Sequence, residues 1–158
     1  MYTIDKDIVA ELSDVPPLDG GAPEPVMFVN DRRLVLAYFT SAIELEQIAC
    51  VEFLHCCAHY FGSPNDEILH GHPLYERGLK HYSIVEVKDS SWIRSLERIN
   101  SVHKRHDPKR FQLLRHFIFA FPDSMFECVA QGFTASTYNA QYKATSEALL
   151  EFLKRSHS

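Results

Sequence analysis

The strongest constraint on the fold is a pair of short apolar segments, residues 116–121 and 125–130, which are joined by Pro122-Asp123-Ser124. Proline, aspartate and serine favour a tight turn, and both flanking segments can alternate as strands. One face of the predicted pair would carry Phe117, Phe119, Phe121, Phe126, Cys128 and Ala130. Because large aromatic side chains on one face of a hairpin are typical of a buried core, we expect this hairpin to be central.

A second hairpin is predicted earlier in the chain. Residues 26–29 and 33–39 are both apolar, and they flank Asn30-Asp31-Arg32, which has the chemistry of a turn. Residues 82–88 also alternate as a strand. Since tight hairpins join antiparallel neighbours, the sheet should be largely antiparallel.

Residues 41–61 fit two structures. Ser41 and Glu44 have the spacing of a helical capping box, and Gly62 could end such a helix. The same stretch also alternates as a strand, and from residue 48 to 61 its only formal charge is Glu52. A surface helix of that length would show a polar stripe, so we favour a bend at 41–46 and a strand at 47–61.

Two helices complete the predicted domain. One is expected near 91–105, with an apolar face that includes Trp92, Leu96 and Ile99, and Pro108 should end it. The other is expected near 139–154 and should cover the sheet. The prediction is an α+β fold, mostly an antiparallel β-sheet of half-barrel or sandwich-like form, with one inserted helix and one C-terminal helix.

The length of 158 residues suits one domain. Residues 13–25 hold four prolines and two glycines, so residues 1–25 are predicted to form an acidic N-terminal arm. The globular domain should span 26–158. No stretch is apolar enough to cross a membrane and residues 1–15 do not resemble a leader, which together predict a cytoplasmic protein. The four cysteines are expected to be reduced core thiols.

Charge is distributed unevenly along the chain, whose net charge is −5. Residues 94–116 contain seven basic residues against Glu97 and Asp107. Such a segment could bind an anion, but it carries no aromatic stacking module and the protein as a whole is acidic. We therefore expect no nucleic-acid partner, and a solvated helix face and loop is the alternative interpretation of these charges.

The loop at 62–79 is long and rich in turn residues, which is typical of functional loops. It contains His70, His72 and Glu76, whose side chains could share a divalent metal if the segment were extended. The seven residues 70–76 resemble the core of the first metal motif of the cupin family. The resemblance implies a β-barrel metal site in which His116 could act as a remote ligand, and Fe, Mn or Zn would suit such donors.

Three functional hypotheses follow, and the sequence leaves open whether the protein is an enzyme. The first is a non-catalytic binding or protein-interaction module that uses the 62–79 loop and the basic 94–116 segment and requires no cofactor. The second is a cupin-like metal-dependent enzyme, and the third is an enzyme that acts on a small anionic metabolite. A protein partner, a small-molecule ligand or a homo-oligomer would each fit. The candidate ligand-binding residues are His70, His72, Tyr75, Arg77, Arg110 and Arg115.

Overall fold

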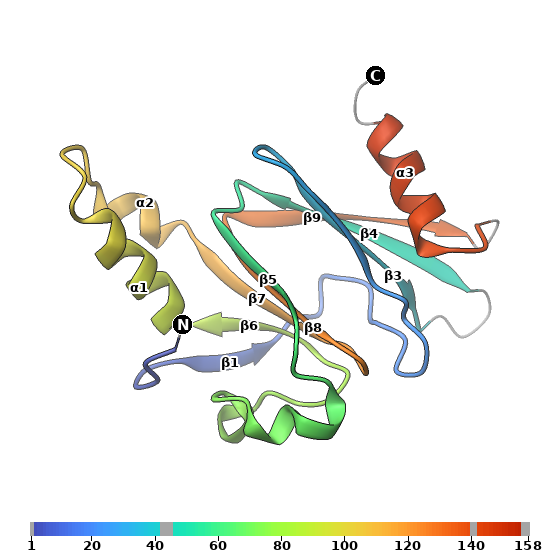
Figure 1. The fold of residues 1–158 in the computed structure, drawn as a ribbon, viewed down its shortest axis with the longest axis horizontal. Helices are drawn as coiled ribbons and strands as arrows, with labels where there is room; N and C mark the ends of the chain where they lie inside the picture. The colour runs from blue at the N-terminus through green and yellow to red at the C-terminus, as the bar shows by residue number, and fades with distance from the viewer. Residues whose placement is uncertain (1, 42–45, 140–141, 156–158) are drawn as a thin grey trace.

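Two antiparallel sheets form the centre of the protein (Figure 1). The computed structural model describes residues 2–41, 46–139 and 142–155. The five-stranded sheet has the order β1-β6-β7-β8-β5, and the four-stranded sheet has the order β2-β3-β4-β9. The strands of the first are β1 (Ile8–Glu11), β6 (Ile84–Lys88), β7 (Arg115–Ala120), β8 (Met125–Ala130) and β5 (Ala58–Gly62). Those of the second are β2 (Val26–Val29), β3 (Leu34–Thr40), β4 (Gln47–Leu54) and β9 (Gly132–Asn139).

The main hydrophobic core lies between the two sheets. Phe53 of β4 is its centre, with its ring 5.8 Å from the ring of Phe117, 5.9 Å from that of Phe119 and 5.2 Å from that of Phe126. These three phenylalanines belong to β7 and β8 and are fully buried. The predicted aromatic face of the second hairpin is therefore confirmed, and it packs against the other sheet as in a sandwich.

Helical segments cover the outer faces of both sheets. The helix α3 (Thr145–Arg155) lies on the four-stranded sheet, where Ala148, Leu149 and Phe152 are buried. The short 3-10 helices η1 (Asp66–Gly71) and η2 (Tyr75–Arg77) lie on the five-stranded sheet. The predicted α+β class is correct, and the described strands form no closed barrel.

Both predicted hairpins are confirmed, and the structure gives their registers. In the first, Val29 pairs with Leu34, so that the turn is Asn30-Asp31-Arg32-Arg33. In the second, Ala120 pairs with Met125. The strand predicted at 82–88 begins two residues later, at Ile84.

The strand predicted at 47–61 is two strands. β4 ends at Leu54, and β5 begins at Ala58 in the other sheet, where it pairs with β8. The break lies at His55, which has a left-handed backbone with φ of 50°. A left-handed φ is incompatible with the extended backbone of a strand, so β4 ends there and the chain passes to the other sheet. Of the bend predicted at 41–46, residues 42–45 lie outside the described residues.

The helix predicted near 91–105 is shorter than expected. α1 spans Ser91–Asn100, and a second helix, α2 (Pro108–Gln112), follows it. Pro108 was expected to end a helix, but it begins one, because proline is tolerated in the first turn and Asp107 accepts a hydrogen bond from the Lys109 N–H. The expected apolar face is also incomplete, since Ile99 is 68% exposed.

The C-terminal helix begins at Thr145 and not near residue 139. Residues 132–139 form the strand β9, which pairs with β4 along its whole length. That strand was not predicted, because its central residues are Thr, Ala, Ser and Thr and most are exposed. A half-exposed edge strand with so few apolar residues has a weak sequence pattern.

The segment predicted as an N-terminal arm packs on the domain. β1 pairs with β6 at the edge of the five-stranded sheet, and Leu18 forms a bridge with Thr40. Val15 and Leu18 are buried in the core between the sheets. Among the described residues, no helix combines the length and apolar character needed to cross a membrane.

The Phe core can be tested by substitution. Phe119→Ala should lower the free energy of unfolding by about 3–5 kcal/mol, because it leaves a cavity among closely packed rings. Chemical denaturation monitored by circular dichroism would measure this change. Leu113→Ala is the matched control, since Leu113 is 61% exposed and its loss should cost less than about 0.5 kcal/mol. Equal effects of the two substitutions would contradict the assigned core.

Candidate functional site

An apolar groove runs along the free side of α1. Its volume is about 380 Å³. Ile99 is 68% exposed and Val102 is 90% exposed, which is high for large apolar side chains. Residues from the β4–β5 turn and α2 complete the groove, whose lining is Cys57, Leu96, Ile99, Asn100, Val102, His103 and Phe111. Contiguous exposed apolar surface of this kind is typical of an interaction site.

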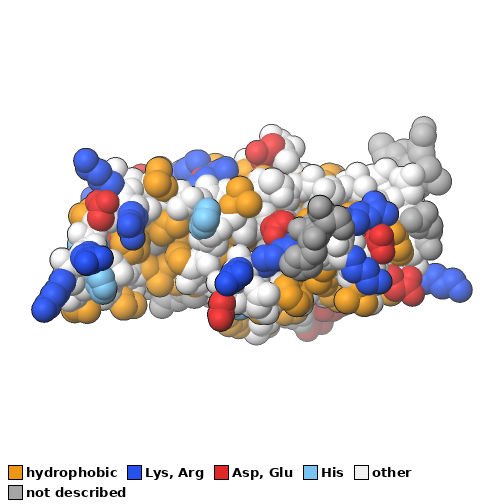
Figure 2. Space-filling model, turned by 90° about the horizontal axis from the view of Figure 1, so that it is seen from above, with side chains coloured by type: hydrophobic (Ala, Val, Ile, Leu, Met, Phe, Trp, Pro, Cys, Tyr) orange, Lys and Arg blue, Asp and Glu red, His pale blue; other side chains and the backbone are white. Residues whose placement is uncertain are grey.

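Exposed basic side chains lie on the same two helices and the turn that joins them. Figure 2 shows Lys and Arg side chains gathered at the end of the molecule formed by α1 and α2, with hydrophobic side chains between them. Five exposed basic residues belong to this end, namely Arg98, Lys104, Arg105, Lys109 and Arg110. The two acids of the segment are already engaged, since Glu97 lies 3.7 Å from His106 and Asp107 caps α2. We call the groove and these five residues the α1–α2 surface.

A second feature is a buried polar network on the outer face of the five-stranded sheet. Its centre is Glu127 of β8, which is 1% exposed. One carboxylate oxygen lies 3.2 Å from Nε2 of His72, and the other lies 3.0 Å from Nε2 of His116. The hydroxyl of Tyr2 donates a short hydrogen bond to the second oxygen. Three donors, from the N-terminal segment, the 62–79 loop and β7, therefore meet at one carboxylate of β8.

The network holds Glu127 in its charged form. Burial raises the pKa of Glu127, but the hydrogen bonds from His116, His72 and Tyr2 lower it more, to about 2. Burial and the neighbouring Glu127 raise the pKa of Tyr2, so this phenol stays protonated and donates a hydrogen bond to Glu127. Donors from three directions thus compensate the desolvation of one anion.

The proton positions on the two histidines follow from their partners. Nδ1 of His72 accepts a hydrogen bond of 3.1 Å from the Leu74 N–H, so the ring proton lies on Nε2 and is donated to Glu127. His116 also donates from Nε2 to Glu127. Its Nδ1 lies 2.9 Å from Oγ of Ser90, and this contact extends the network toward α1.

Ser90 stands at the junction of β6 and α1. It is the N-cap of the helix, and its Oγ accepts a hydrogen bond from the Ile93 N–H. Asp89, between strand and cap, has a positive φ of 49°, which makes the turn sharp. The next residue, Ser91, is anchored through its N–H and hydroxyl to the buried carboxylate of Asp7. The ring of Trp92 packs edge to face against that of His116, with 5.2 Å between the ring centroids.

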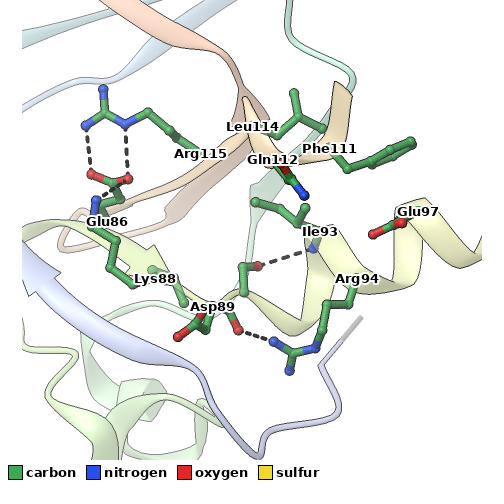
Figure 3. A pocket seen from close by; sticks show the side chains of 12 residues that line it. Glu86, Lys88, Asp89, Ile93, Arg94, Glu97, Phe111, Gln112, Leu114 and Arg115 are labelled. Atoms are coloured by element: carbon green, nitrogen blue, oxygen red, sulfur yellow. Dashed lines mark hydrogen bonds and ion pairs between the residues drawn. The ribbon is translucent and has the colours of Figure 1, made fainter. Parts of the chain in front are cut away.

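Ser90 also lines a pocket of about 460 Å³ between the ends of β6 and β7 and the two helices (Figure 3). Arg115 forms a bidentate pair with Glu86 at 3.0 and 2.7 Å, and Lys88 joins the same carboxylate at 2.7 Å. Ile93 and Phe111 give the pocket an apolar wall. Of the charged residues in its lining, Lys88, Arg94 and Arg115 balance Glu86, Asp89 and Glu97.

The structure separates the residues predicted to form a metal site. His70 and Glu76 are exposed, whereas His72 is buried and bonded to Glu127. The segment is not extended as the metal hypothesis requires, because His70 lies in η1 and Glu76 in η2. Within the described residues, no group of three or more His, Cys, Asp or Glu side chains is placed to hold a metal ion.

The other predicted site residues fall in different places. Arg115 lines the pocket, and His116 belongs to the buried network. Arg77 donates to the backbone carbonyls of Asp5 and Asp7, which fastens the N-terminal segment. Tyr75 is partly buried and packs with the apolar residues beneath η1 and η2. Arg110 is exposed on α2 as part of the α1–α2 surface.

The cysteines differ from the expectation in part. Cys50 and Cys128 are buried as predicted, whereas Cys56 is half-buried and Cys57 is exposed. The cause is the change of sheet at His55–Cys57, which brings this apolar sequence to the surface. Sequence reasoning also missed the roles of Tyr2, Ser90 and Glu127, whose contacts join residues up to 125 positions apart. For Ser90 a local signal existed, since serine follows a strand and precedes a helix.

Comparison with protein-family models, with curated proteins and with solved structures gave no match to this chain.

The charged state of Glu127 predicts an acid-sensitive fold. The Glu127 pKa is about 2 in the folded protein and about 4.5 ordinarily, so its stabilisation is complete above pH 4.5 and is lost as the pH falls toward 2. Glu127→Gln should lower the free energy of unfolding at pH 7 and reduce its loss between pH 4.5 and 2. Urea unfolding at each pH would measure both effects. Glu76→Gln, at an exposed glutamate, is the control. If Glu127→Gln lost as much unfolding free energy between pH 4.5 and 2 as the wild type, Tyr2, His72 and His116 would not be holding a buried anion.

The metal hypothesis has its own test. A metal at Nε2 of His72 would have to displace the proton that this atom donates to Glu127, so we expect no specific metal response. Added zinc, iron(II) or manganese should shift the melting temperature of the wild type and of His70→Ala equally. A rise that occurs in the wild type and disappears in His70→Ala would restore the predicted site.

Proposed function

We propose that the protein is a binding domain whose α1–α2 surface docks an acidic amphipathic segment of a partner protein. The observation that carries this proposal is the exposure of Ile99 and Val102 in a groove whose surroundings are basic. An apolar groove binds the apolar face of a partner segment, and the surrounding bases pair with acids on its flanks. This narrows the predicted interaction module to the segment 94–116.

The architecture supports a binding role for this unit. α1 is anchored at its first turn, through Ser90, Ser91 and Trp92, while its last turn extends away from the sheets (Figure 1). A rigid helix that presents apolar residues needs little ordering when it binds, which favours affinity. The 62–79 loop, the other predicted contact region, covers the sheet and contributes His72 to the buried network, so we leave it out of the proposed surface.

The proposed setting is the cytoplasm. All four cysteines carry free thiols, which suits a reducing compartment. A partner segment that is acidic is favoured over a nucleic acid, because the groove between the bases is apolar and offers little for a phosphate backbone to contact.

Binding of a designed probe would test the proposal. The probe is a fluorescent helical peptide with leucines at i, i+3, i+4 and i+7 and glutamates on the remaining positions, titrated by fluorescence anisotropy. Ile99→Asp should weaken binding at least tenfold, because each buried aliphatic side chain contributes about 1.5–3 kcal/mol. Lys104→Glu together with Arg105→Glu should weaken it further and reduce its salt dependence.

Matched controls lie on α3. Leu150 is 58% exposed and Lys154 is exposed, so Leu150→Asp and Lys154→Glu change surface of the same kind away from the groove. Both should bind the peptide like the wild type. Equal binding by Ile99→Asp and the wild type would overturn the proposal, as would a preference for a basic peptide of the same pattern or for duplex DNA.

A further inference from the structure

The pocket beside α1 and the buried network meet at Ser90, which lines the pocket and is 3% exposed. Oγ of Ser90 lies 2.9 Å from Nδ1 of His116, and Nε2 of the same ring lies 3.0 Å from Glu127. Because Glu127 is a charged acceptor, His116 donates to it from Nε2, and Nδ1 is left to accept the proton of Ser90. The order of groups is hydroxyl, imidazole and carboxylate, which is the arrangement that activates a serine nucleophile.

We propose that Ser90 is the nucleophile of a second, hydrolytic site that cleaves small carboxylic esters, with His116 as its general base. Glu127 is a positioning residue in this site. It fixes the tautomer of His116 and stabilises the imidazolium that forms, while Tyr2 and His72 hold the carboxylate itself in place.

The backbone around Ser90 fits this role. A strand, a sharp turn and a helix succeed one another over residues 84–100, and the serine occupies the start of the helix. The left-handed Asp89 makes the turn sharp, and a strained residue of this kind is characteristic of functional sites.

The pocket indicates the class of substrate. Its volume of about 460 Å³ suits a small molecule. The positive and negative charges of its lining residues are equal in number, so the pocket favours a substrate without net charge over an anion or a cation. Ile93, Phe111 and Leu114 offer an apolar wall for a short acyl chain.

The proposed reaction balances with water as the second substrate. Oγ of Ser90 attacks the ester carbonyl carbon while its proton moves to Nδ1 of His116. The bond from carbon to the leaving oxygen then breaks, and the alcohol departs with that proton. Water next gives a proton to Nδ1 and adds its oxygen to the acyl carbon. The bond to Oγ breaks, the acid leaves, and Ser90 recovers its proton.

Two measurements on the full chain test this site. Phenylmethylsulfonyl fluoride should attach to the wild type with loss of fluoride, and peptide mass spectrometry should place the adduct on Ser90. p-Nitrophenyl acetate and butyrate should be hydrolysed, and Ser90→Asn should lower the rate at least 10²-fold. Asparagine is also a good helix cap, so this variant keeps a capping group while it removes the nucleophile, and circular dichroism would check that it is folded.

Two further variants make the result specific. Ser101→Ala removes an exposed serine at the other end of α1 and should leave labelling and hydrolysis unchanged. Ser90→Cys should shift labelling at this position to iodoacetamide. Failure of the wild type to react, or equal labelling and turnover in folded Ser90→Asn, would overturn the proposal. These outcomes are independent of peptide binding at the α1–α2 surface.

Discussion

The buried carboxylate of Glu127 is the interaction on which the arrangement of the five-stranded sheet depends. It is charged and nearly inaccessible to water, and its stabilisation comes from Tyr2 at the N-terminus, His72 after η1 and His116 of β7. Loss of any one donor would leave part of a buried charge unpaired, which is strongly destabilising. The N-terminal segment and the 62–79 loop are therefore held on the sheet by the same group, and neither can leave without cost to the other.

The sequence predicts most of the sheet because its signals are local. Alternating phenylalanines on both sides of Pro122-Asp123-Ser124 predicted the hairpin of β7 and β8, and the same logic placed β2 and β3. It did not predict the break at His55, because the flanking residues alternate without interruption and only a left-handed φ separates the strands. β9 was missed for the opposite reason, since its exposed polar residues show no alternation although its hydrogen bonds to β4 are complete.

The site was harder to predict than the fold. His72 was nominated from its spacing to His70, a near neighbour in sequence, and His116 only as the remote ligand that the cupin resemblance implies. In the structure the partner of His72 is Glu127, 55 residues away, and His70 faces solvent. A glutamate inside an apolar strand gives no local sign of the donors that will meet it, because they come from segments that only the tertiary fold brings together. Composition and spacing identified the right residue types and could not identify the contacts.

The helix α1 shows how one element meets two opposed demands. Its first turn is fixed by Asp7, by the Ser90 cap and by Trp92 against His116, and the proposed nucleophile Ser90 would need this degree of positioning. Its last turn extends beyond the sheets, where Ile99 has no core to enter. Apolar residues there add nothing to the stability of the isolated domain and expose it to aggregation. Their presence is accounted for if a partner covers them, and because the anchored turn lies at the other end of the helix, that partner can bind without displacing Ser90.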